Sequence, residues 1–250
     1  MLPDMNPLTW AILGVAALVT ATISGFLGMG GGMVLLAIMT LLMPAHMVVP
    51  IHGVVQLASN GTRTFIFLPH VRWRVFVVYV VPATVGLIAA TFVWSGDKMF
   101  WFKPAIGLFI LGFLIYRRYS PKLRNPALWI YAPLGLVVGF LSIFVGATGP
   151  FLAPFFLRDD FQKENVIATK AACQMWLHLA KIPAFLVLEF NYAQHWLLLA
   201  GLVAAVIVGT YVGKRLLGKM SERFFSILFQ GVLAVIAIVL IVNGVGVWFT

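Results

Sequence analysis

Apolar residues run in long stretches along this chain, and polar residues interrupt them only briefly. Most of the apolar blocks are close to the roughly 20 residues that a helix needs to cross a bilayer. In chain order, the eight blocks cover about 8–43, 47–68, 75–94, 99–119, 127–157, 164–188, 193–217 and 222–247. The pattern predicts an all-α polytopic membrane protein, and the composition of 62% hydrophobic and 10% charged residues agrees with it.

Two of the blocks, 8–43 and 127–157, are too long for one span, and each is interrupted near its middle. The first contains GFLGMGGGM (25–33) and the second contains GATGPFLAP (146–154). Glycine and proline inside a membrane helix release backbone groups, which must be satisfied within the protein or in a water-filled cavity. We therefore expect each block to be a helix, a break and a second helix that returns to the starting side.

The basic residues favour this topology over eight simple crossings. If both long blocks return, only Lys98 and Lys103 fall towards one face, and the other basic residues of the loops share the opposite face. That common face holds Arg72, Arg74, Arg117, Arg118, Lys122, Arg124, Arg158, Lys163, Lys214, Arg215, Lys219 and Arg223. The positive-inside rule makes it cytoplasmic. We expect a multi-pass protein of a bacterial inner membrane with both termini outside the cytoplasm.

The second half of the chain repeats the first at a shift of 118 positions, which places Gly149 on Gly31. Each copy contains one returning block and three crossings. Because three is odd, the second copy enters the membrane from the opposite side. The expected architecture is one membrane domain of two inverted-topology repeats, 1–118 and 119–250, as in many secondary transporters.

A polar stripe recurs in both copies. In HGVVQLASNGTR (52–63), intervals of four, four and three residues place the polar side chains on one face of a helix. These side chains belong to His52, Gln56, Asn60 and Arg63. The segment KAACQMWLHLAK (170–181) has the same spacing. Its polar side chains belong to Lys170, Gln174, His178 and Lys181.

The stripes bring cations but no carboxylates into the apolar blocks, because all seven acidic residues lie at or near loops or block ends. An unpaired Arg63 or Lys181 in hydrocarbon would cost on the order of several kcal/mol. We therefore expect both to face a hydrated cavity whose guest is an anion. Two other interpretations remain open. The amides and histidines could join helices by hydrogen bonds, and the cations could extend to the membrane interface.

Three segments carry a family resemblance that covers about residues 10 to 245. SGFLGMGGGMVLLAIM (24–39), GATGPFLAPFF (146–156) and ENVIATKAACQMWLHLAKIPAF (164–185) together resemble the sulfite exporter TauE/SafE family of membrane transporters. The second glycine cluster departs from the common pattern at Ala147, Thr148 and Pro150. The resemblance implies transport of sulfur-containing anions such as sulfite or organosulfonates, often outward and in some cases linked to the proton gradient.

Together these features predict a secondary transporter with alternating access around a midplane anion site. Arg63 and Lys181 would supply charge, and His52 and His178 are candidate proton carriers. The expected substrate-binding residues are Ser24, Gly30, Gly31, Gln56, Asn60, Arg63, Ser142, Thr148, Gly149, Gln174, His178 and Lys181.

The expected partners are a small anion, membrane lipids and, in a homo-oligomer, further copies of the chain. No nucleic acid is expected, because the net charge of +10 is spread over short loops between apolar runs. No cofactor or metal is expected either. The glycine cluster does not fit a dinucleotide motif, since no strand precedes it. An anion channel and a non-transporting scaffold remain alternatives. An intramembrane enzyme is disfavoured, because no interior carboxylate and no paired nucleophile and base are visible.

Overall fold

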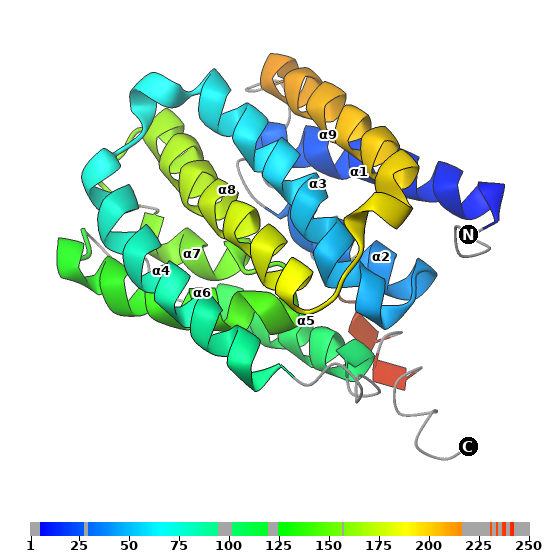
Figure 1. Ribbon diagram of the computed structural model, residues 1–250. Coiled ribbons are helices and arrows are strands. Elements are labelled where there is room, and N and C mark those ends of the chain that lie inside the picture. Colours follow the sequence, from blue (N-terminus) through cyan, green and yellow to red (C-terminus); the bar gives the residue numbers. More distant parts are fainter. Residues whose placement is uncertain are drawn as a thin grey trace.

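The computed structural model describes residues 6–27, 30–94, 102–119, 125–156 and 158–216, with a few positions between 231 and 242 (Figure 1). Every regular element in these ranges is a helix. The α-helices are α1 (Pro7–Leu27), α2 (Gly31–Leu42), α3 (Ala45–Ile66), α4 (Trp73–Val93), α5 (Phe102–Tyr119), α6 (Tyr131–Val145), α7 (Gly149–Phe156), α8 (Lys163–Val187) and α9 (Trp196–Leu216). Three short 3-10 helices are η1 (Leu68–His70), η3 (Leu128–Ile130) and η4 (Tyr192–His195). The predicted block 222–247 lies almost entirely outside the described residues.

Both long apolar blocks are broken where the glycines predict a break. The first block divides into α1 and α2, and the second divides into α6 and α7. Gly30, before α2, has a φ of +95°, and Gly146, after α6, has a φ of +78°. Side chains disfavour this backbone conformation, whereas glycine adopts it without steric cost. The helices after the breaks begin at Gly31 and Gly149, which are 118 positions apart, in agreement with the repeat.

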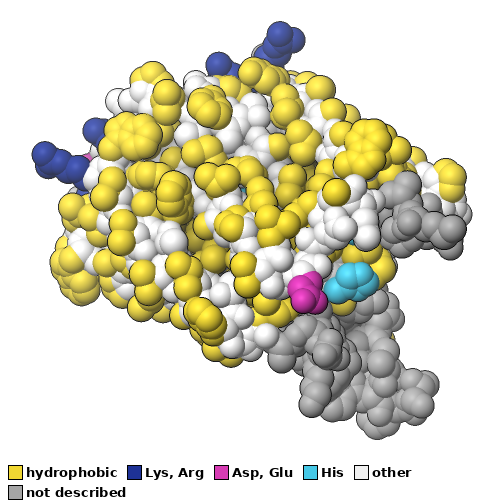
Figure 2. Space-filling model, viewed as in Figure 1, with side chains coloured by type: hydrophobic (Ala, Val, Ile, Leu, Met, Phe, Trp, Pro, Cys, Tyr) yellow, Lys and Arg dark blue, Asp and Glu magenta, His cyan; other side chains and the backbone are white. Residues whose placement is uncertain are grey.

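The second long block returns to the end from which it starts. The Arg158 guanidinium, which follows α7, donates a 2.7 Å hydrogen bond to the carbonyl oxygen of Pro126, which precedes η3. Arg72 lies over the ring of Phe161, so the loop between α3 and α4 is at this end too. The exposed basic side chains in this view lie along the upper and left edge of the surface (Figure 2). Among the predicted basic residues, the side chains of Lys98, Lys103, Arg117, Arg118, Lys122, Arg124, Lys219 and Arg223 lie outside the described residues.

The two helices that carry the polar stripes, α3 and α8, pack against each other at the centre of the molecule (Figure 1). They run antiparallel, because Gly53 lies beside Lys181 and Gly61 lies beside Met175. Four helical segments of the described chain are long and apolar enough to cross a membrane. These segments are Pro7–Gly25, Trp73–Val93, Leu128–Val145 and Tyr192–Leu216. The spans thus lie on α1, α4, α6 and α9, which surround the more polar central pair.

The surrounding helices form two tightly packed pairs, α4 with α6 and α1 with α9. In the first pair, Gly139 lies against the Ala83 backbone. In the second, Gly209 lies against the Leu18 backbone. Small residues allow this close approach, which is common where membrane helices associate. Each pair joins a helix of residues 1–118 to a helix of residues 119–250. The outer surface is largely hydrophobic, as Figure 2 shows for one face.

Candidate functional site

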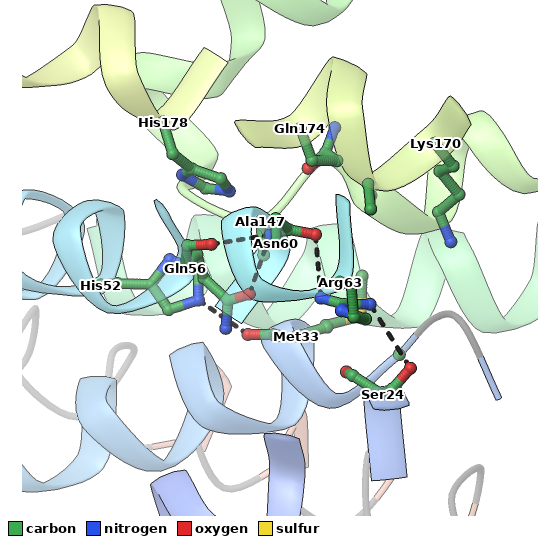
Figure 3. A pocket seen from close by; sticks show the side chains of 14 residues that line it. Ser24, Met33, His52, Gln56, Asn60, Arg63, Ala147, Lys170, Gln174 and His178 are labelled. Carbon is green, nitrogen blue, oxygen red and sulfur yellow. Dashed lines mark hydrogen bonds between the residues drawn. The ribbon is translucent and has the colours of Figure 1, made fainter. Parts of the chain in front are cut away.

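A small cavity lies between the two polar stripes, beside the breaks in both long blocks (Figure 3). Its volume of about 40 Å³ has room for about three water molecules. The residues that line it are Ser24, Gly30, Gly32, Met33, His52, Gln56, Asn60, Arg63, Ala147, Gly149, Lys170, Ala171, Gln174 and His178. The lining therefore comes from both halves of the chain, and its charged and amide side chains are all buried.

On the α3 side, hydrogen bonds hold three polar side chains in a row along the cavity. Arg63 donates to Asn60 Oδ1 over 2.8 Å, and Asn60 donates to Gln56 Oε1 over 3.3 Å. The guanidinium also donates to the carbonyl oxygen of Ser24 over 3.4 Å, in the last turn of α1. Arg63 is only 4% exposed. It therefore points into the protein (Figure 3) and does not extend to the membrane interface.

On the α8 side, two buried polar atoms have no hydrogen-bond partner among the described residues. They are Nε2 of Gln174 and Nδ1 of His178. An unsatisfied buried polar group costs about 1–3 kcal/mol, so such groups commonly mark a place where a ligand or water binds. Lys170 lines the same side and is also buried. Gln174 can donate a hydrogen bond from this atom to an oxygen atom in the cavity.

The two histidines meet across the contact between α3 and α8. The rings of His52 and His178 are 6.0 Å apart between centroids, at an interplanar angle of 73°. His52 Nε2 lies 2.8 Å from the carbonyl oxygen of Gly32. A carbonyl oxygen only accepts, so Nε2 carries the hydrogen and Nδ1 faces inward without a partner among the described residues. Nδ1 of each ring is therefore buried without a hydrogen-bond partner among the described residues.

The breaks aim two helix N-termini at the cavity. α2 begins at Gly31 with Gly30 and Gly32 in the lining, and α7 begins at Gly149, which is itself in the lining. The first N–H groups of a helix have no partner within the helix. Together with the helix dipole, they form a favourable environment for an anion. Glycine keeps this approach open, because a Cβ at Gly32 would lie 3.0 Å from the side chain of Gln56.

Lys181 lies beside the cavity and is not part of its lining. Its ammonium donates a 2.8 Å hydrogen bond to the carbonyl oxygen of Gly146, at the end of α6. Lys181 is 1% exposed, so it does not extend to the interface. The bond matches the contact of Arg63 with Ser24 at the end of α1. In each half, the last cation of the stripe therefore contacts the C-terminal end of a broken helix.

A model of the sulfite exporter TauE/SafE family matches residues 13–240. The chain belongs to this family. TauE/SafE proteins are membrane transporters and not enzymes, so the chain is an integral membrane protein. No curated protein and no solved structure matches the chain.

The cavity of this TauE/SafE protein is electropositive. Arg63 and Lys170 contribute two cationic side chains, and no carboxylate of the described residues lines it. Excess positive charge in a confined space of low dielectric attracts anions strongly. The family implies a small anionic substrate, and the chemistry of this lining is compatible with one.

The lining of this TauE/SafE cavity differs in part from the predicted site. Three predicted residues besides Lys181 lie outside it: Gly31, Ser142 and Thr148. Ser142 donates to the Gly139 carbonyl oxygen within its own helix. Five lining residues were not among the predicted site residues: Gly32, Met33, Ala147, Lys170 and Ala171. Lys170 was predicted as part of the second stripe, at the position equivalent to His52, but was not counted among the substrate-binding residues.

Proposed function

We propose that this protein is a secondary transporter that exports small sulfur-containing oxyanions, sulfite or organosulfonates, by alternating access. The observation that carries the proposal is the cavity itself. Arg63, Lys170 and Gln174 line it, no carboxylate of the described residues does so, and α2 and α7 begin beside it. An oxyanion in this position would lie close to the Arg63 guanidinium and to the N-terminal ends of both helices.

The lining offers donors that suit an oxyanion. The guanidinium of Arg63 is planar and can bind two oxygen atoms at once. Gln174 Nε2 is unpartnered among the described residues and can donate one further hydrogen bond. The small volume of about 40 Å³ suits the few heavy atoms of sulfite, and an organosulfonate would require the cavity to widen.

The packing of the stripes supports an inverted repeat. α3 and α8 have matching polar positions 118 residues apart and run antiparallel. Two equivalent helices that run antiparallel are related by an axis perpendicular to both. For helices that cross a membrane, such an axis lies in the membrane plane, which is the symmetry of many alternating-access carriers.

Burial of the lining supports a carrier more than a channel. The side chains of Arg63, Lys170, Gln174 and His178 are each at most 5% exposed. A conducting channel needs a continuous path, whereas a carrier encloses its substrate between openings to either side. Proton linkage would use His52 and His178, which both line the same cavity.

Flux in liposomes tests this function. Labelled sulfite and methanesulfonate would be measured with and without a pH gradient, in the wild type, in Arg63→Ala and in Arg215→Ala. Arg215 is an exposed cation at the end of α9 and serves as the matched control. We expect saturable flux and counterflow in the wild type and the control, and loss of flux in Arg63→Ala. Flux without saturation would indicate a channel. Saturable flux that survives in folded Arg63→Ala would place the site elsewhere.

A further inference from the structure

A second, larger pocket opens at the basic end of the molecule and shares no lining residue with the central cavity. Its volume is about 460 Å³, more than ten times that of the central cavity, and within the range typical of small-molecule sites. The residues that matter here are Arg72, Arg74, Leu128, Arg158, Asp160 and Phe161. Three guanidinium groups and one carboxylate therefore line it, which leaves a net positive charge.

The arginines of this basic pocket come from both halves of the chain, and two of them, Arg72 and Arg158, are held in place. Arg72 and Arg158 lie over the ring of Phe161, at 5.6 Å and 5.0 Å from its centroid. Such cation–π contacts fix the guanidinium planes. Arg158 pairs with the carboxylate of Asp160 through two bonds of 2.7 Å and 2.9 Å. The Arg72 guanidinium also donates a hydrogen bond of 3.4 Å to Asn165 Oδ1. Among the described residues, neither Arg72 nor Arg74 forms an ion pair with a carboxylate.

The surroundings of the pocket are those of a lipid headgroup region. Trp73, between Arg72 and Arg74 in sequence, is 53% exposed, and Trp129, next to Leu128, is 70% exposed. Exposed tryptophans are enriched at the level of the lipid headgroups. From Trp73 onwards, α4 presents exposed apolar side chains at Val77, Val81 and Val85. The pocket therefore lies at the end of an apolar helix face that acyl chains can cover.

We propose that this basic pocket binds the phosphate of an anionic phospholipid of the cytoplasmic leaflet. Arg72 and Arg74 would bind the phosphodiester oxygens, the tryptophans would lie among the headgroups, and the acyl chains would run along α4. Basic pockets at the cytoplasmic ends of membrane helices recognise anionic lipids in this way. This inference does not depend on the proposed transport function.

Native mass spectrometry of the purified full-length protein tests the proposal directly. The protein would be exchanged into mixed micelles that contain phosphatidylglycerol or phosphatidylcholine, and bound lipid would be counted. We expect the wild type to retain phosphatidylglycerol in preference to phosphatidylcholine. The double substitution R72Q/R74Q should weaken that retention by about tenfold or more, since each basic residue near a membrane surface contributes measurably to binding anionic lipid.

The matched control is K214Q/R215Q, which removes two exposed charges from the end of α9 and leaves the pocket intact. It should retain lipid as the wild type does. Equal retention in wild type and R72Q/R74Q would overturn the proposal, as would equal loss in both double variants.

A competition experiment with inorganic phosphate and glycerol phosphate distinguishes a lipid site from a site for soluble anions. If they displace phosphatidylglycerol at low concentration, the pocket is a soluble-anion site and the lipid assignment is wrong. Thermal unfolding of each variant in detergent excludes misfolding as the cause.

Discussion

The ammonium of Lys181 lies 2.8 Å from the carbonyl oxygen of Gly146, where α6 ends at the break of the second long block. The guanidinium of Arg63 makes the corresponding contact with Ser24 at the end of α1. The carbonyl groups at a helix C-terminus carry partial negative charge. These contacts stabilise two buried cations without using a carboxylate. The cavity therefore keeps a positive character that a nearby acid would cancel.

Replacing Lys181 should affect stability first. In Lys181→Met the Gly146 carbonyl loses its donor, and an unsatisfied buried group costs about 1–3 kcal/mol. We expect a lower thermal unfolding midpoint in detergent, whereas Lys214→Met, at an exposed position, should leave the midpoint unchanged. An unchanged midpoint combined with lost flux would instead place Lys181 in the substrate path.

Gln174 provides a sharper test of the cavity. Its Nε2 is buried without a partner among the described residues, so Gln174→Ala should remove a substrate hydrogen bond and raise KM about tenfold, which corresponds to 1.4 kcal/mol. Gln174→Glu should abolish flux, because it places a negative charge beside the anion. Gln194→Ala, at an exposed position in η4, is the control. If Gln174→Glu transports normally, this part of the cavity does not hold the anion.

Gly32 should be intolerant of a methyl group for a local reason. A Cβ there would lie 3.0 Å from the carboxamide of Gln56, which would have to move towards the cavity. We expect Gly32→Ala to fold normally and to reduce flux severalfold. Gly14→Ala adds the same methyl group to α1, where nothing lies within 4 Å, and should transport like the wild type. Equal flux in the two variants would show that Gly32 does not contribute to the transport site.

Adding a methyl group at the contact between α4 and α6 should lower the stability of the protein. A Cβ at Gly139 would meet the backbone carbonyl of Ala83, and two backbones cannot separate without loosening the whole interface. Overpacking of this kind costs about 1–3 kcal/mol. Gly139→Ala should therefore lower the unfolding midpoint, and Gly201→Ala, which meets nothing within 4 Å, should not. A stable Gly139→Ala would show that the interface can widen.

Asp160 should reduce how strongly the basic pocket binds anionic lipid, and it should not make that binding depend on pH between about pH 5 and pH 8. The Arg158 guanidinium holds the pKa of the Asp160 carboxyl below its usual value. The pair thus stabilises the fold at every pH above about 3.9, the value for an unfolded chain, and the contribution is lost only as the pH falls through the lower folded pKa. We expect phosphatidylglycerol retention to be constant between about pH 5 and pH 8. Asp160→Asn should increase retention, because it frees Arg158. A decrease would contradict the assigned charge balance.

The sequence predicted which helix faces and helix breaks form the site better than it predicted the depth and partner of each side chain. Helical spacing places Gln56, Asn60 and Arg63 on one face, and that face does line the cavity. Glycine composition located both breaks, since few other residues adopt the backbone conformations of Gly30 and Gly146. These features depend on residues close together in sequence, which is why they could be predicted.

The depth and partner of each side chain could not be predicted in the same way. Lys181 shares a helix face with Gln174, but its flexible side chain reaches the end of α6, whose position only the tertiary structure sets. Lys170 lies two turns inside α8. From the sequence, it is close enough to the preceding loop for its side chain to extend to the membrane interface. In the structure α8 packs so closely on α3 that Lys170 is buried against the cavity.

The pairing of α1 with α9 and of α4 with α6 changes what can move as a unit. Each pair combines one helix from residues 1–118 with one from residues 119–250, and glycines allow the two backbones to pack closely. The two halves of the sequence are therefore interlocked, and neither can rotate as a block without carrying a helix of the other. We expect the rigid bodies of transport to be these mixed pairs, rocking about the antiparallel α3 and α8. A chain cut near residue 120 would then assemble only when both fragments are made together.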